Sequence, residues 1–190
     1  IQLRSTPLGG ANPVPEMHLD LRTLLAADSF VIAIAGIVML GAAYRGVAPR
    51  LAKWWGTGCL LIAGATGILA AYGGLPEIST RVAAATLINI ASACEWATAR
   101  SARNASTPLP AILAGALVWI VALALPGLDS AHLQMALLWA IGAAYSFAAA
   151  SEMWRGRDEV IAPRWALFIL FLLDGSFKAI YIQGEDILQS

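Results

Sequence analysis

The sequence predicts an all-α fold: a polytopic bundle of six transmembrane helices with its N-terminus outside. Of the 190 residues, 59% are hydrophobic and only 13% are charged, whereas a soluble domain averages about 45–50% and 25%. The hydrophobic residues also form long continuous blocks, as membrane helices of about 20 residues require, whereas strands of a membrane barrel alternate over about ten residues. The composition argues against intrinsic disorder, nucleic-acid binding and a soluble enzyme.

Residues 1–16 differ from everything that follows them. They contain three prolines and two adjacent glycines, and they show no hydrophobic periodicity. They lack the apolar stretch of a signal peptide. We therefore expect a disordered leader or a vector-derived segment, with Met17 as the native start. Residues 17–190 then form one transmembrane domain.

Six apolar blocks follow, each of a length suited to a membrane helix. They span residues 24–44, 54–72, 80–100, 110–125, 130–154 and 163–183. Pro110 and Pro163 stand where a first helical turn accepts proline, and Ser130 is a suitable N-cap. The pairs Gly73-Gly74 and Pro126-Gly127 end the blocks before them.

The basic residues predict the orientation of the bundle, because cytoplasmic loops are enriched in Lys and Arg. Eight of the twelve basic residues fall in alternate connections: Arg45, Arg50, Lys53, Arg100, Arg103, Arg155, Arg157 and Arg164. That face is predicted to be cytoplasmic, so both termini lie outside. A cytoplasmic output domain would then need a seventh crossing after Ser190, and we expect this chain to be part of a longer protein.

One pair of opposite charges stands inside the last apolar block. Asp174 and Lys178 are four residues apart, so they share one helix face and can pair. A charge near the bilayer centre costs about 2.5–3.5 kcal/mol on insertion scales, so its presence there calls for a structural or functional explanation. Two interpretations stay open: a self-neutralised structural pair, or part of a ligand cavity that opens outward.

Three further polar residues are predicted at outer or central depth. Asp28 lies at the outer level, where it could reach Lys178, and Arg81 opens the third helix at the outer surface. Asn89 is placed mid-bilayer, where it needs a partner across a helix interface. Depth alone groups Asp28, Arg81, Asn89, Asp174 and Lys178 as a candidate ligand-binding pocket. Glu95 and Glu152 lie near cytoplasmic ends, and we expect both to form interfacial ion pairs with the arginines that follow them.

No catalytic or metal-binding pattern accompanies these residues. His18 and His132 are far apart in the sequence, and Cys59 and Cys94 lie inside apolar blocks without CxxC spacing. No phosphate-binding loop or nucleophile motif is present. We therefore expect neither a cofactor nor an enzyme activity in this chain.

Several segments resemble one bacterial family in their order and spacing. They are LDLRTL (19–24), WWGTGCLLIAGATGILAAYGGLPE (54–77), LINIASACEWATARSAR (87–103), AYSFAAASEMWRGRDE (144–159) and PRWALF (163–168). Together they resemble the N-terminal membrane sensor region of diguanylate cyclases, which carry a cytoplasmic GGDEF domain. Members often have a histidine and, about two turns later, an arginine in the sixth helix. Here Asp174 and Tyr181 hold those places, so the resemblance implies no shared ligand.

The resemblance implies a function as well as a location. It implies a multi-pass sensor domain in the bacterial inner membrane, a homodimer, and control of a GGDEF domain that makes cyclic-di-GMP in the same polypeptide. Two alternatives remain: a small-solute transporter or channel with Asp174 and Lys178 in its path, and a structural membrane subunit of a larger complex.

Overall fold

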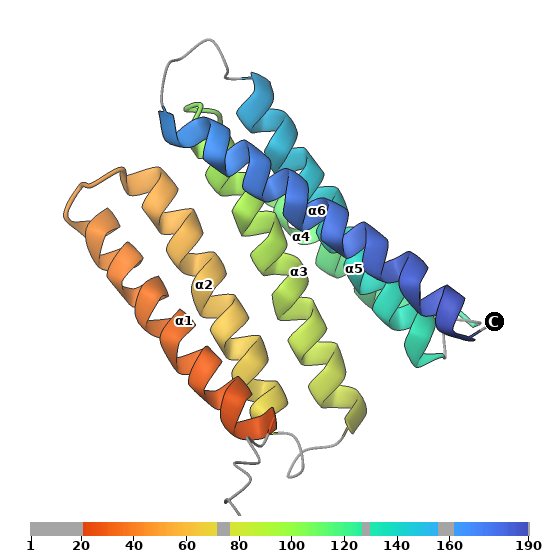
Figure 1. Cartoon of the computed structure of the whole chain (residues 1–190). Coiled ribbons are helices and arrows are strands. Elements are labelled where there is room, and N and C mark those ends of the chain that lie inside the picture. Colours follow the sequence, from red (N-terminus) through yellow and green to blue (C-terminus); the bar gives the residue numbers. More distant parts are fainter. Residues whose placement is uncertain (1–20, 72–76, 127–129, 156–161, 190) are drawn as a thin grey trace, which may run out of the picture.

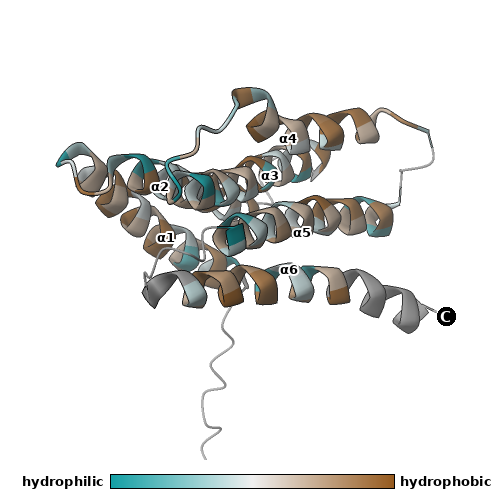
Figure 2. Ribbon diagram, turned by 90° about the horizontal axis from the view of Figure 1, so that it is seen from above, coloured by the Kyte–Doolittle hydropathy of each residue, from teal (hydrophilic) through white to brown (hydrophobic). Residues whose placement is uncertain are grey.

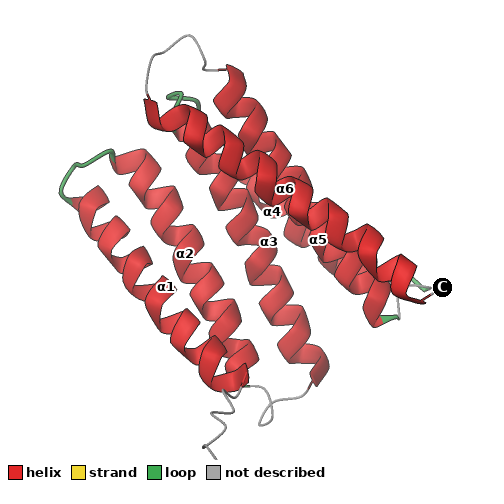
Figure 3. Ribbon diagram, in the orientation of Figure 1, coloured by secondary structure: helices red, strands yellow, loops and turns green. Residues whose placement is uncertain are grey.

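The computed structural model describes residues 21–71, 77–126, 130–155 and 162–189. Those residues form six α-helices and no strand (Figure 3). The helices are α1 (Leu21–Tyr44), α2 (Pro49–Ala70), α3 (Glu77–Ser101), α4 (Leu109–Leu123), α5 (Ala131–Arg155) and α6 (Ala162–Gln189). The predicted all-α class is confirmed. Residues 1–16, for which we predicted disorder, lie outside the described residues.

Four of the helices match their predicted blocks within three residues at each end, whereas α2 and α6 depart further. Helix α2 begins at Pro49 rather than near Trp54, because proline suits a first helical turn and the charged Arg50 and Lys53 continue the helix beyond its apolar block. Helix α6 runs to Gln189, past the end of the apolar block. Hydropathy therefore marks the part of a helix suited to hydrocarbon rather than the whole helix.

Three of the described helices are long and apolar enough to cross a membrane. These segments are Arg22–Tyr44, Ile78–Ser101 and Ala131–Arg155, and α4 is a shorter apolar helix of 15 residues. Their length and composition indicate association with a membrane. Figure 2 shows long hydrophobic stretches on these helices, with hydrophilic residues gathered mainly toward helix ends. Helix α1 also exposes large apolar side chains along its length, including Phe30, Val31, Ile34 and Ile37.

Helix α3 lies at the centre of the bundle. It packs against α2, α4 and α5, while α6 packs along α5 (Figure 1). Small residues make this central position possible, because they let helix backbones approach closely. Ala84, Ala85, Ala93, Ala97 and Ala99 of α3 are all buried. Helix α1 packs along α2 and approaches no other described helix.

Helix α4 packs mainly against α3, and a tyrosine of α5 bonds to its backbone. The hydroxyl of Tyr145 donates a hydrogen bond to the carbonyl of Ala111 at 2.8 Å and accepts one from the Gly115 amide at 3.0 Å. Gly115 provides the space for this contact, since a Cβ built there would lie 2.7 Å from the Tyr145 ring. Tyr145 therefore fixes the position of α4 against the bundle.

Many of the basic residues gather at one end of the bundle. Figure 1 shows that the α1–α2 turn lies on the same side as the C-terminal ends of α3 and α5. We call this the basic end, defined by Arg45, Arg50, Lys53, Arg100, Arg103 and Arg155. A hydrophobic cluster of Ala99, Ala149, Ala150, Met153 and Phe171 joins α3, α5 and α6 close to it.

Candidate functional site

The predicted pair on α6 is present and has a third member on α5. The ammonium nitrogen of Lys178 lies 2.6 Å from Oδ2 of Asp174. Ser146 of α5 donates a hydrogen bond to the same carboxylate oxygen at 2.6 Å, and it accepts one from Lys178 at 3.2 Å. Ser146 is fully buried. The three side chains thus satisfy one another at the α5–α6 interface.

The lysine side chain lies along a glycine of α5. A Cβ built at Gly142 would lie 3.4 Å from Cδ and 3.8 Å from Nζ of Lys178, which is ordinary van der Waals contact. Gly142 stands one turn before Ser146, so the two residues line the same face of α5. The lysine side chain therefore packs against the same face of α5 that carries Ser146.

Glu95 of α3 adds a second carboxylate near this pair. It interacts electrostatically with both Lys178 and Asp174, although it is on a different helix. The predicted interfacial ion pair of Glu95 with Arg100 is therefore wrong: Arg100 instead binds Glu152 at 3.2 Å. We call Glu95, Ser146, Asp174 and Lys178 the interior polar cluster. Fully ionised, its two carboxylates and one ammonium would carry one net negative charge.

Asn89 is the most completely buried of the predicted site residues. Its exposed fraction is 0%, and neither atom of its side-chain amide forms a hydrogen bond with the described residues. We expected a partner for it across a helix interface, and the described residues supply none. Burial of an amide without hydrogen bonds is costly and uncommon. Asn89 is six residues before Glu95, about 9 Å along the helix axis.

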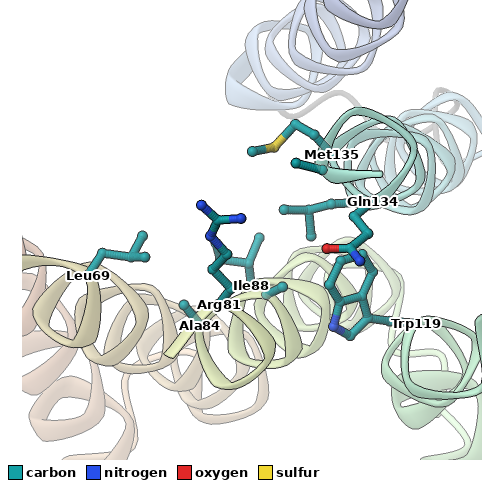
Figure 4. Close-up of a pocket in the computed structure, with 10 residues that line it drawn as sticks. Leu69, Arg81, Ala84, Ile88, Trp119, Gln134 and Met135 are labelled. Carbon is teal, nitrogen blue, oxygen red and sulfur yellow. The ribbon is translucent and has the colours of Figure 1, made fainter. Parts of the chain in front are cut away.

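Arg81 lines a cavity at the end of the bundle opposite the basic end. The cavity measures about 290 Å³ and adjoins a second one of about 330 Å³, and both are lined by Arg81, Trp119, Ala131 and Gln134. Figure 4 shows Arg81 extending toward the open centre of the cavity, while Gln134 lies against Trp119. Apolar side chains of α2, α3 and α5 complete the walls of this Arg81 cavity: Leu69, Ile88, Met135 and Leu138.

Asp28 stands apart from the other four predicted residues. It is exposed on α1, and α1 packs along α2 without approaching α6. The expectation that Asp28 could reach Lys178 is therefore wrong. The single pocket grouped by depth divides into four locations: the Asp174–Lys178 pair, the buried Asn89, the Arg81 cavity and the exposed Asp28.

A second charged cluster at the basic end confirms the predicted ion pairing of Glu152. This nearly buried carboxylate binds Arg100 and Arg103 of the α3 end, and it lies 3.5 Å from Arg155 on its own helix. Arg100 also donates hydrogen bonds to the Ser106 carbonyl and stacks over Trp96 at 5.1 Å. One carboxylate therefore holds three arginines and joins α3 to α5.

Sequence reasoning did not identify Ser146, Gly142, Trp119 or Gln134 as members of these sites. A small residue four positions before a serine, as in Gly142 and Ser146, is a weak signal for a polar contact between helices. Among the described residues, no group of three or more His, Cys, Asp or Glu side chains could hold a metal ion. Comparison with known proteins gives no match to any protein family, curated protein or solved structure.

Proposed function

We propose that this chain is a signal-input domain of the bacterial inner membrane, in which all six helices cross the bilayer and both termini lie outside. Its output is a diguanylate cyclase domain of the GGDEF type, carried by the same polypeptide beyond Ser190. The resemblance of segments 19–24, 54–77, 87–103, 144–159 and 163–168 supports the family. The clustering of basic residues at one end supports the orientation.

One observation carries the proposed sensory role: helices α3 and α5 both contribute residues to three polar sites along the bundle. On α5, Gln134, Leu138, Gly142 and Ser146 recur every four residues, so they lie on one face that runs from the Arg81 cavity to the interior polar cluster. On α3, Arg81, Ile88 and Glu95 recur every seven residues. Farther along, the same two helices are joined by Glu152 and its arginines.

This arrangement is suited to signal transmission along the bundle. A molecule that binds near Arg81 with different affinities for two packings of α3 and α5 would shift the balance between those packings. The contacts of Lys178, Asp174 and Glu152 would shift with it, because they connect α3, α5 and α6. The basic end would then pass the change to a dimeric cyclase. Exposed apolar faces of the outer helices are available for homodimer formation.

The full-length gene product tests this proposal. Sequencing past the codon for Ser190 is expected to reveal a seventh apolar block and then a GGDEF domain. In membranes containing that protein, Lys178→Ala is expected to change the rate of cyclic-di-GMP synthesis, whereas Arg22→Gln, far from the basic end, leaves it unchanged. A gene that ends soon after Ser190 would overturn the proposal.

The interior polar cluster also supports a second candidate function, transport of a small solute. A small-solute transporter or channel also needs charged groups between its helices, near a cavity that opens at one end. Solute flux into liposomes that contain the purified chain, abolished by Asp174→Asn, would favour this function over the sensor. A structural subunit would show no flux and would instead copurify with other proteins at fixed stoichiometry.

A further inference from the structure

A basic cavity at the α1–α2 turn is separate from all the sites described above. It measures about 420 Å³ and is lined by Leu40, Ala43 and Tyr44 at the end of α1 and by Pro49, Arg50 and Lys53 at the start of α2. We call it the hairpin cavity. One wall is apolar and aromatic, and the other carries two cations. The cavity is thus amphipathic.

The cations of this turn have no acidic partner among the described residues. No described residue forms an ion pair with Arg45, Arg50 or Lys53. The sequence contains no Asp or Glu between Asp28 and Glu77, so the α1–α2 hairpin has no carboxylate near this end. The nearest basic-end carboxylate that the structure describes, Glu152, already holds three arginines. The two cations at the start of α2 are exposed, so they are free to bind an anion from outside the described residues.

The turn holds the cavity in a fixed shape. Helix α1 ends in a Schellman motif, in which the Val47 amide bonds to the Ala42 carbonyl at 3.0 Å and the Gly46 amide to the Ala43 carbonyl at 3.1 Å. Gly46 adopts the positive φ of 81° that this motif requires. Pro49 then begins α2 at once. Backbone geometry consequently sets how the ends of α1 and α2, which carry the two walls of the cavity, lie relative to each other.

The residues around the cavity are of the kinds that concentrate where hydrocarbon meets headgroups in a bilayer. Tyr44 ends the most apolar long helix and is 95% exposed, and Trp54 and Trp55 follow Lys53 directly. Aromatic side chains of this kind concentrate at the boundary between hydrocarbon and headgroups. The apolar wall then faces acyl chains, and the cationic wall faces the headgroup layer.

We propose that the hairpin cavity binds the phosphate headgroup of an anionic phospholipid. Arg50 and Lys53 contact the phosphate, and Leu40, Ala43 and Tyr44 contact the glycerol and upper acyl region. Basic pockets beside membrane helices bind such headgroups in the same way. The inference needs only membrane association and does not depend on the sensor function.

Native mass spectrometry of the full chain, with phosphatidylglycerol or phosphatidylcholine of matched acyl chains, tests the proposal. Phosphatidylglycerol is expected to bind more tightly. Arg50→Gln and Lys53→Gln are each expected to weaken it about fivefold, which corresponds to about 1 kcal/mol per basic residue near an anionic surface. Arg45→Gln removes the same charge from the same turn outside the cavity, and it is expected to change binding less than twofold.

A charge-neutral variant provides an independent arm. Ala43→Trp fills the cavity without altering its charge and is expected to weaken phosphatidylglycerol binding at unchanged helix content by circular dichroism. Equal losses with Arg45→Gln and Arg50→Gln would overturn the proposal in favour of diffuse attraction. So would equal binding of phosphatidylcholine, or full binding by Ala43→Trp. Displacement of the lipid by inorganic phosphate at similar concentration would indicate a soluble phosphate ligand instead.

Discussion

Lys178 and Asp174 form an ion pair of 2.6 Å within one helix, four residues apart. Ser146 is the additional partner, and it contacts both charges from α5. The Lys178 side chain is 13% exposed and that of Asp174 is 39% exposed, so a charge that loses its partner here keeps part of the cost of desolvation without the attraction that offsets it. The consequence of a substitution therefore depends on which charges remain.

For this pair we predict that the single variant is less stable than the double one. Lys178→Ala leaves the Asp174 carboxylate without its cation, whereas Asp174→Ala with Lys178→Ala removes both members of the pair. The single change is expected to lower the free energy of unfolding by about 1 kcal/mol more than the double change, because Asp174 is partly exposed. Unfolding in mixed micelles of mild detergent and dodecyl sulfate would measure the difference. Equal stability of the two variants would show that the pair does not matter energetically.

The Glu152 cluster leads to a second prediction. Glu152→Gln leaves three arginines beside a nearly buried site without the one carboxylate that they share, and we expect a loss of about 3 kcal/mol. Arg155→Gln is the matched control, because Arg155 is 65% exposed and its contact is 3.5 Å long. Its loss is expected to stay within about 0.5 kcal/mol. Thermal melts of both variants in the same detergent test this, and the idea fails if Arg155→Gln costs as much as Glu152→Gln.

The spacing of residues along the sequence predicted some of these contacts, but it did not predict which residues of different helices would meet. Asp174 with Lys178 follows from a separation of four residues on one helix, and Glu152 was predicted to pair from its place beside a basic helix end. Glu95 and Asp28 were misplaced because their partners depend on helix rotation and on which helices are neighbours. Hydropathy predicts the depth of a residue in the membrane. It does not predict how a helix is rotated or which helices lie next to it. Asp28 is isolated because α1 packs only along α2 among the described helices.

The third prediction concerns two residues of the α1–α2 turn that have a positive φ, Gly46 and Ala48. Glycine adopts this conformation without strain, whereas alanine does not. Ala48 has a φ of 42°, in the left-handed region, where a side chain costs about 1–2 kcal/mol relative to glycine. We expect Ala48→Gly to stabilise the protein by about 1 kcal/mol. Gly46→Ala should destabilise it by a similar amount, and only through the backbone, because a Cβ at Gly46 meets nothing within 4 Å. Thermal melts showing the same sign for both changes would contradict this account.

The crossing of α1 and α2 depends on two glycines, and a fourth prediction follows from their contact. A Cβ built at Gly56 would lie 2.9 Å from the Gly36 carbonyl oxygen, and one at Gly36 would lie 3.0 Å from the Gly56 carbonyl oxygen. Backbone atoms cannot turn aside as a flexible side chain can, so Gly56→Ala must push the helices apart. We expect a loss of about 1–3 kcal/mol.

Gly41 of α1 is the matched control for this crossing, because a Cβ there meets nothing within 4 Å. Gly41→Ala is expected to stabilise the protein by up to about 1 kcal/mol through helix propensity alone. The separation between α1 and α2 can be followed by the distance between spin labels at Val38 and Thr57. That distance should increase in Gly56→Ala and stay constant in Gly41→Ala. A constant distance and unchanged stability in Gly56→Ala would show that the helices do not touch at these glycines.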